Sequence, residues 1–304
     1  MNINITDPIF HNEEAAERHI FLSRWPDGEP ICPHCGSTNT MVMGGKTQAG
    51  YHLCRDCRDK FTIRTGTVME RSHVPLSKWL LATHLMAASK KGMSASQMAR
   101  MLGVTYKTAW FLCHRIREAM MPSPNETGPL GGAGKFVEVD ETFVGGKAKN
   151  RAHKPVAAKK VVVSLVERDG KARSFHVANI KARDLRSMIV TNVDRSSHLM
   201  SDESHVYTWV GREFASHGKV NHGAREYVRG ADHSNCAENF FSIFKRGYVG
   251  TYHHMSEAHL HRYTAEFDFR YNFRKSSDGE CAAAALRGME GKRLTYRRIG
   301  RLAA

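Results

Sequence analysis

Two Cys-x-x-Cys pairs near the start of the chain constrain its fold more than any other feature. The first is Cys32/Cys35 in the stretch ICPHCGS, and the second is Cys54/Cys57 in LCRDCRDKF. A thiolate pair separated by two residues can present both sulfurs to one metal ion, and two such pairs form the closed tetrahedral site of structural zinc. The eighteen residues between the pairs lie within the spacing range of such sites. The sequence therefore predicts a zinc ribbon that holds one structural Zn²⁺.

Two other uses of the paired cysteines are less well supported. Disulfides are typical of secreted proteins, and the N-terminus MNINITDPIF lacks the basic and then apolar pattern of a secretion signal. A redox dithiol needs only one such pair, on a thioredoxin-like unit. The remaining cysteines, Cys113, Cys236 and Cys281, are scattered along the chain, and we expect them to be reduced packing residues.

The charge balance indicates a polyanionic partner. Lysine and arginine outnumber aspartate and glutamate 45 to 30, which gives a formal net charge of +15 at pH 7. An excess of this size most simply indicates binding to nucleic acid. No apolar run reaches the roughly eighteen residues of a membrane span, so we expect a cytoplasmic protein with no membrane partner.

Three helices are predicted after the ribbon. One follows Pro75, a second runs through SASQMARMLG with Ser94 or Ser96 as its N-cap and Gly103 as its stop, and a third runs through TYKTAWFLCHRIREAM. This layout is that of a helix-turn-helix, although a plain three-helix bundle would give the same pattern. In the helix-turn-helix the residues expected to enter the major groove of DNA are Thr105, Tyr106, Lys107 and Thr108.

A stretch rich in proline and glycine at residues 122–135 separates this region from the rest of the chain. Beyond it the hydrophobic pattern predicts the element order β-β-β-α-β-α-β-α-α. That order is typical of an RNase H-like α/β fold, a mixed sheet with helices on both faces. The predicted plan is a ribbon with an N-terminal helix (1–70), the helix-turn-helix (71–121), the linker (122–135), the RNase H-like domain (136–275) and a basic tail (276–304).

Three carboxylates are placed where this fold would bring them together. Asp140 lies within the first apolar strand, Asp202 ends the fourth, and Glu238 opens a later helix. The first and fourth strands are neighbours in such a sheet, and a buried carboxylate is costly unless it is paired or bound to metal. Three converging carboxylates suit Mg²⁺ or Mn²⁺. Two such ions would activate a water or a 3′-hydroxyl and stabilise the leaving oxygen of a phosphodiester.

Neighbouring acids are weaker candidates for the first two positions. Glu141 follows Asp140 directly, so strand alternation turns it to the opposite face of the sheet. We choose Asp140 because its end of the sheet is shared with Asp202. Glu203 is a weaker rival to Asp202.

The third position has two alternatives. The spacing Asn235-x-x-Glu238 also fits a capping box, which would make Glu238 structural. Asn239 could be the ligand instead, but it lies about 100° around the helix from Glu238. Lys245 is seven residues after Glu238 and therefore on the same helix face. There it would hold a DNA phosphate, with Arg246 beside it.

Taken together, these motifs resemble those of bacterial insertion-sequence transposases that join a zinc ribbon and a helix-turn-helix to a DDE integrase-type core. The matching stretches are CPHCGS and CRDC, VEVDETFVGGK, SDES, HSNCAENFFSIFKRG and FRYNFR, in the family's order and over nearly the whole chain. The resemblance implies the three acids at Asp140, Asp202 and Glu238 and the trailing lysine at Lys245.

The resemblance also implies an activity and partners. These are binding to terminal inverted repeats, Mg²⁺-dependent cleavage at the element's ends, and joining of the 3′-hydroxyls to target DNA. A homodimer or larger assembly in a bacterial, nucleoid-associated location would follow. The alternatives are a structure-specific nuclease of the same fold, which would cut without joining, and a non-catalytic zinc-ribbon regulator, which would have no need of buried acids.

Overall fold

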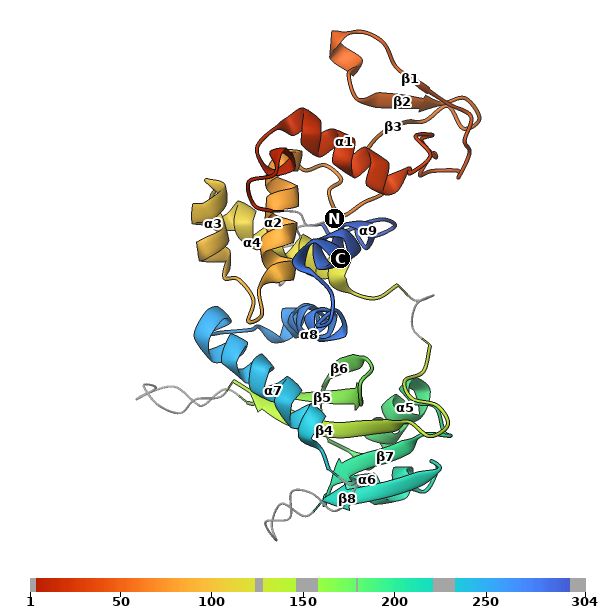
Figure 1. Ribbon diagram of the computed structural model, residues 1–304, viewed down its shortest axis with the longest axis vertical. Helices are drawn as coiled ribbons and strands as arrows, with labels where there is room; N and C mark the ends of the chain where they lie inside the picture. Colours follow the sequence, from red (N-terminus) through yellow and green to blue (C-terminus); the bar gives the residue numbers. More distant parts are fainter. Residues whose placement is uncertain (1–3, 124–127, 146–157, 179, 221–232, 296–304) are drawn as a thin grey trace, which may run out of the picture. The chain divides into compact units, whose positions relative to one another are not determined.

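The computed structural model describes residues 4–123, 128–145, 158–178, 180–220 and 233–295. The chain divides into two compact units (Figure 1). The first consists of Met1–Ser89, Met93–Pro122 and Ser276–Ala304, and the second of Lys90–Gly92 and Ser123–Lys275. The first unit is therefore assembled from segments that lie on both sides of the second in sequence.

The first unit begins with a helix and a small sheet. Its elements are η1 (Pro8–Phe10), α1 (Glu13–Arg24), β1 (Thr40–Val42), η2 (Lys46–Gln48), β2 (Tyr51–Cys54) and β3 (Lys60–Thr62). The three strands form an antiparallel sheet in the order β1-β2-β3. Ring contacts between Trp25 at the end of α1 and both His52 and Phe61 in the sheet join the helix to the ribbon. The zinc ribbon and the helix before it thus share an aromatic core.

The three helices predicted after the ribbon are present as α2 (Leu76–Ala88), α3 (Ala95–Leu102) and α4 (Tyr106–Met120). Ser94 is the N-cap of α3, because its side chain accepts the N–H of Gln97 at 3.2 Å. Gly103 ends α3 in the left-handed region at φ 61°, where a residue without Cβ is favoured. Thr105 then caps α4. These local signals set the bounds of α3 and α4, which fit both the predicted helix-turn-helix and a plain three-helix bundle.

The segment that we expected to be a basic tail begins with a helix, α9 (Asp278–Arg287). A capping box between Ser277 and Glu280 starts it, and it packs against α2 and α4. Small side chains allow this close approach: a Cβ added at Gly288 would lie 2.3 Å from the carbonyl oxygen of Ala119. Residues 296–304 of the expected tail lie outside the described residues.

The second unit is built on a five-stranded mixed sheet in the order β6-β5-β4-β7-β8. Its strands are β4 (Phe136–Val144), β5 (Lys160–Glu167), β6 (Ala172–Val177), β7 (His198–Asp202) and β8 (Ser216–Val220). The pairs β4/β5 and β5/β6 are antiparallel, whereas β4/β7 and β7/β8 are parallel. The predicted RNase H-like order of elements and the predicted neighbourhood of the first and fourth strands are both confirmed.

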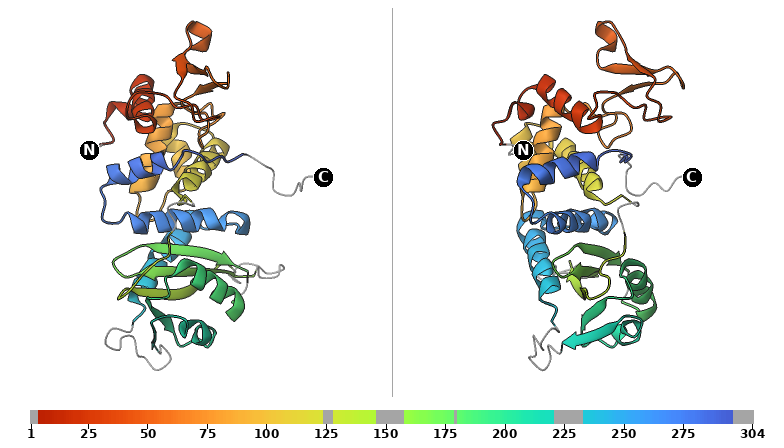
Figure 2. Two further views of the ribbon diagram at one scale, coloured as in Figure 1. Left: turned by 90° about the vertical axis from the view of Figure 1, so that its right-hand side faces the viewer. Right: turned by 45° about the vertical axis from the view of Figure 1, so that its right-hand side comes forward.

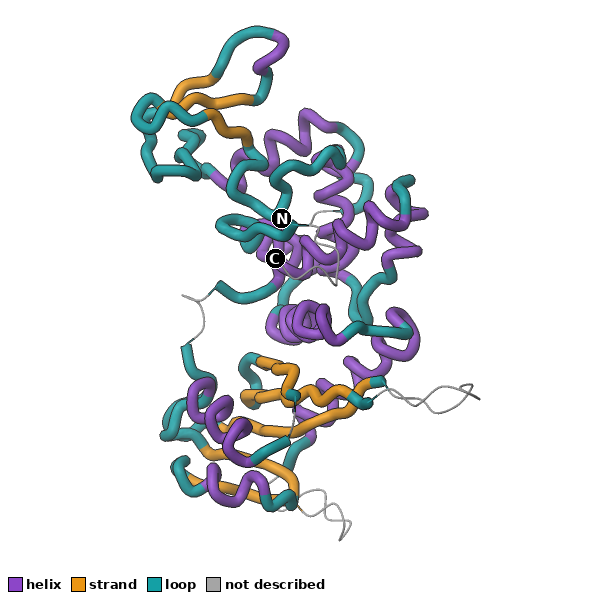
Figure 3. Tube along the Cα trace, turned by 180° about the vertical axis from the view of Figure 1, so that it is seen from behind, coloured by secondary structure: helices purple, strands orange, loops and turns teal. Residues whose placement is uncertain are grey.

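Helices cover both faces of this sheet. They are α5 (Ala182–Asn192), α6 (Val206–Gly211), α7 (Asn235–Gly247) and α8 (Glu257–Asn272), with a short π-helical turn η5 (Tyr248–Tyr252) between the last two. The right-hand view of Figure 2 shows α5 and α7 on opposite sides of the sheet. Figure 3 shows the strands gathered in the ribbon and in this sheet only, among the described residues.

Strand alternation divides the interior of the second unit into two hydrophobic cores. Val137 and Val139 belong to the core shared with α5 and α6, whereas Val162 and Val166 belong to the core shared with α7 and α8. Phenylalanines of α7 fill the second core, and each buried phenyl group contributes roughly 1.5–3 kcal/mol. The sheet therefore holds α7 firmly against the face of β4 that carries Asp140. Within the described part of the chain no helix is long and apolar enough to cross a lipid bilayer.

Candidate functional site

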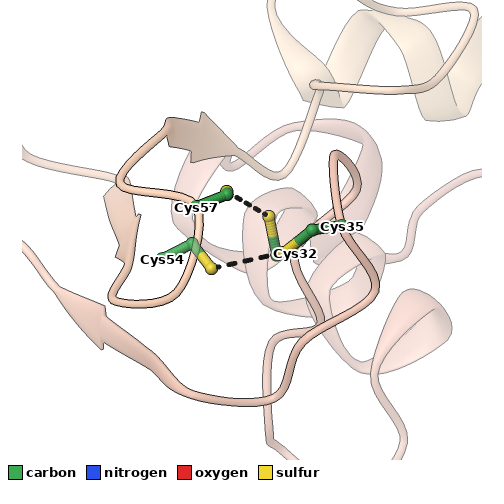
Figure 4. Close-up of side chains that lie close together, drawn as sticks. All are labelled: Cys32, Cys35, Cys54 and Cys57. Carbon is green, nitrogen blue, oxygen red and sulfur yellow. Dashed lines mark hydrogen bonds between the residues drawn. The ribbon is translucent and has the colours of Figure 1, made fainter.

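The four cysteines of the ribbon form one compact cluster (Figure 4). Their sulfur atoms all lie within 4.8 Å of one another, with 3.7 Å between Cys32 and Cys57 and 3.6 Å between Cys35 and Cys54. A tetrahedron with Zn–S bonds of about 2.3 Å places its sulfurs roughly 3.8 Å apart. The donor set and its spacing therefore fit zinc, as the sequence predicts. All four positions of the tetrahedron are taken by protein, so the zinc is structural.

The geometry of this cluster also excludes the disulfide alternative, because all four cysteines are free. Backbone N–H groups of Cys57 and Asp56 lower the pKa of the Cys54 thiol to about 7, whereas burial and the neighbouring sulfurs raise the pKa values of Cys35 and Cys57. One thiol of the cluster therefore ionises first, and a bound metal would stabilise the other thiolates. Asp56 in turn accepts hydrogen bonds from Ser37 at 2.5 Å and from Asn39 at 2.9 Å. These bonds tie the two cysteine loops together.

The predicted DNA-reading residues lie at the start of α4. Tyr106 is 59% exposed, and Thr105 and Lys107 are also exposed, whereas the rest of the helix is largely buried. Thr108 is half-buried and its hydroxyl bonds that of Thr105 at 2.9 Å. Thr105, Tyr106 and Lys107 are therefore the exposed residues of this group.

Asp140 and Asp202 lie on the adjacent parallel strands β4 and β7. The register pairs Phe136 with His198 and Glu138 with Met200, and each acid follows two residues after the last of these pairs. Because side chains two residues apart on a strand point to the same face, Asp140 shares a face with Glu138 and Asp202 shares a face with Met200. Both acids are partly buried.

The electrostatics of Asp140 indicate a concentration of negative charge. Burial raises its pKa to about 7, and the carboxylates of Glu141, Asp202 and Glu238 add to this increase, against a hydrogen bond from the Glu141 N–H. Such clustered carboxylates repel one another unless a cation lies between them. Their hard oxygen donors suit Mg²⁺ or Mn²⁺, so the residues present fit a divalent cation.

The three acids do not form a closed ligand set in this conformation. Within the described residues, only the four cysteines bring three or more metal-binding atoms within 4.8 Å of one another, so the oxygens of Asp140, Asp202 and Glu238 are more widely separated. Glu238, Asn239 and Lys245 are all exposed on α7. Of the two candidates for the third position, Glu238 is the one whose charge acts on Asp140.

Glu141 lies on the other face of β4, as strand alternation predicts. The Tyr207 hydroxyl, from a fully buried side chain in α6, donates a hydrogen bond to Glu141 Oε2. Burial and the charge of Asp202 raise the pKa of Glu141 despite this bond. Glu203, the rival to Asp202, is exposed.

Glu138 is a residue of this site that we did not single out from the sequence. Its side chain is 0% exposed, and its Oε2 accepts the N–H groups of Cys236 at 2.8 Å and Ala237 at 3.0 Å at the start of α7. Its Oε1 bonds Arg168 Nε at 2.7 Å and lies 3.3 Å from His233 Nδ1. A carboxylate at a helix N-terminus satisfies free N–H groups and interacts favourably with the helix dipole.

This contact replaces the capping box considered for Glu238. Ser234, not Asn235, is the N-cap of α7; its side chain makes no capping hydrogen bond, and its hydroxyl donates to Glu238 Oε1 at 3.2 Å. Glu138 supplies the acceptors instead, two residues before Asp140 on the same face of β4. The available signal was the position of Glu138 between two apolar residues of the strand, Val137 and Val139.

Comparisons with known proteins agree with this arrangement. Residues 129–272 match the model of the ISXO2-like transposase domain, and residues 11–60 match that of the transposase zinc-ribbon domain. A relative from Halobacterium salinarum, described as an uncharacterized protein in transposable element ISH50, is 27% identical over 285 residues. That alignment covers 88% of this chain and 93% of the relative. The two matched ranges contain the four cysteines and the cluster around Asp140.

Proposed function

We propose that this chain is the transposase of an insertion sequence. Its residues 11–60 match the transposase zinc-ribbon domain family, and its residues 129–272 match the ISXO2-like transposase domain family. It binds the terminal inverted repeats of its element, cleaves DNA at those ends, and joins the freed 3′-hydroxyls to target DNA. The observation that carries this proposal is that the carboxylates of Asp202, on the strand parallel to β4, and of Glu238, at the start of α7, act on the partly buried Asp140 and raise its pKa.

The two units divide the work. In the first, the ribbon and the exposed start of α4 bind the repeat, with Tyr106 and Lys107 as the reading side chains. In the second, Asp140, Asp202 and Glu238 form the reaction centre. Lys245 and Arg246 are exposed in the last turn of α7 and hold DNA phosphates next to this centre.

Asp140, Asp202 and Glu238 would hold two Mg²⁺ or Mn²⁺ ions, and the bound metal would supply activation of the attacking oxygen and stabilisation of the leaving oxygen. Cleavage and joining are both in-line displacements at phosphorus, so one set of carboxylates serves both steps. The residues of the chain orient the DNA: Lys245 neutralises phosphate charge, and Glu138 holds the helix that carries Glu238. Two ends must be handled together, which requires a homodimer or a larger assembly.

A strand-transfer assay with labelled element ends tests this function. The purified chain, with Mg²⁺, is expected to cut a duplex that ends in the element's inverted repeat and to join it to a plasmid. A scrambled duplex of the same length is the control. Cutting without joined product would identify the chain as a nuclease, and binding without either reaction would identify it as a regulator.

A further inference from the structure

A groove in the first unit runs along one face of α4. Its volume is about 820 Å³, and its two walls are α4 and residues 71–75, the segment that leads into α2. Val104, Thr108, Phe111 and Arg115 line it from the α4 side at the spacing of one helix face. The groove therefore extends from the exposed start of α4 towards the buried middle of this helix.

Arg115 is the unusual member of this lining. It is 9% exposed, and its guanidinium lies over the ring of Phe111 with Cζ 4.6 Å from the ring centroid. Its Nε is buried without a hydrogen-bond partner. Among the described residues, no carboxylate oxygen lies within 4.0 Å of it; the nearby Glu70 pairs with Arg71 and Arg293 instead. Burial lowers the pKa of Arg115, but a guanidinium remains charged.

A buried charge without a counter-ion is costly and calls for an anion from outside the chain. The rest of the groove suits an anion as well. Arg71, His73 and Lys107 line it, and no aspartate or glutamate does. The N-terminus of α4 at Thr105 adds the positive end of a helix dipole.

We propose that this groove holds a backbone phosphate of DNA, with Arg115 as its buried anchor. The groove is open and adjoins Lys107 beside the reading residue Tyr106, so a DNA strand that flanks the major groove reaches it while α4 reads the bases. The contact between the guanidinium and the Phe111 ring restricts where the donor groups of Arg115 can lie before a ligand binds, as phosphate recognition favours. The inference rests on the proposed function, since it concerns how the same DNA is held.

The test measures DNA affinity over a series of salt concentrations for the wild-type chain and three variants. Arg115→Gln removes the charge and keeps most of the side chain, whereas Arg115→Lys keeps the charge. Arg18→Gln, an exposed arginine of α1 outside the groove lining, is the matched control. Each protein is measured against the element's end and against a scrambled duplex. Zinc content and thermal unfolding are recorded for all four.

Arg115→Gln is expected to weaken binding to both duplexes about tenfold at 50 mM salt and to reduce the salt slope by about one. Arg115→Lys should recover most of the affinity. Because no carboxylate of the described residues pairs with this charge, its removal should leave the thermal unfolding temperature unchanged or raise it. An arginine that only supports the fold would instead lose stability on substitution.

Three results would overturn the inference: unchanged affinity and slope in Arg115→Gln, a loss confined to the element's end, or an equal loss in Arg18→Gln. A loss confined to the element's end would mean that Arg115 reads a base. Failure of the wild-type chain to prefer the element's end over the scrambled duplex is a separate outcome. It would count against the proposed function and would leave the phosphate contact to be judged from the scrambled duplex alone.

Discussion

Glu138 and Ala237 are 99 residues apart in sequence, yet Oε2 of Glu138 accepts the backbone N–H of Ala237 at 3.0 Å. This bond joins β4 to the start of α7. Because Asp140 lies two residues after Glu138 and Glu238 lies one residue after Ala237, the same contact sets the spacing between two of the predicted metal ligands. Glu138 is thus a positioning residue.

Replacement of Glu138 should disturb both stability and metal binding. Glu138→Gln leaves Arg168 without its buried partner, which typically costs about 3–5 kcal/mol. It should also weaken Mn²⁺ binding by roughly tenfold or more, as changes beside metal ligands commonly do. Denaturant unfolding, Mn²⁺ titration and hydrogen exchange of the Cys236 and Ala237 amides measure these effects.

Asp268→Asn is the matched control for this prediction. Asp268 is also a buried carboxylate with hydrogen bonds, from the N–H and hydroxyl of Ser174, but it is not at the start of α7. It should change stability without changing Mn²⁺ affinity. Unaltered exchange of the two amides in Glu138→Gln would contradict the positioning role.

Loss of zinc should unfold the ribbon and spare the second unit. Cys54→Ser removes one of four ligands, and structural zinc supplies folding free energy directly. Zinc content should fall from one ion per chain to none, and DNA binding should fall with it. The circular dichroism signal of the five-stranded sheet should persist. Cys281→Ala, a buried cysteine outside the cluster, should retain its zinc. Wild-type protein purified without chelator and found to lack zinc would contradict the site.

Asp140, Asp202 and Glu238 should function together as one catalytic unit. Asp140→Asn, Asp202→Asn and Glu238→Gln each remove a charged ligand at constant size and should abolish cleavage and joining while end binding stays nearly intact. A double substitution should be little worse than a single one. Strand-transfer and gel-shift assays on the same protein samples separate the two effects.

Two further variants sharpen that experiment. Asn239→Ala should retain activity; if it is inactive while Glu238→Gln remains active, the third ligand has been assigned to the wrong residue. Lys245→Ala should reduce activity through weaker DNA placement, and the deficit should grow as salt rises.

Substitutions at the start of α4 should distinguish sequence-specific contacts with bases from nonspecific contacts with phosphates. Tyr106→Ala or Lys107→Ala at a base contact should lower the preference for the element's end by about 1–3 kcal/mol, whereas loss of a phosphate contact weakens all sequences alike. Competition between the specific and the scrambled duplex measures the difference. Unchanged binding in both variants would show that α4 is not the reading helix.

Asp268 should make the stability of the protein depend on pH. Burial raises its pKa to about 7, despite the two hydrogen bonds from Ser174. A carboxyl with a raised pKa in the folded state contributes stability that is present below its unfolded pKa and is lost as the pH rises through about 7. Between pH 4 and pH 7, the unfolding free energy of the wild type should therefore decrease relative to that of Asp268→Asn. A constant difference across this range would contradict the raised pKa.

Local patterns predicted most of this fold, because most of it depends on local signals. Ser94 and Gly103 define the ends of α3, and the alternation around Asp140 correctly separates its face from that of Glu141. The order of elements then placed β4 beside β7. The role of Glu138 depends instead on a contact with α7 across about a hundred residues, which no local pattern carries. The helix α9 was not predicted, because the basic residues that follow it favoured the interpretation of the whole segment 276–304 as a basic tail.

The position of α9 in the sequence affects how the chain is made. α9 is synthesised after the sheet-containing unit, yet it packs against α2 and α4, which precede that unit in the sequence. A chain that stops before residue 276 therefore contains α4 without the helix that packs against it. Under the proposed function, such a truncated product should bind the element's ends more weakly than a chain that contains α9.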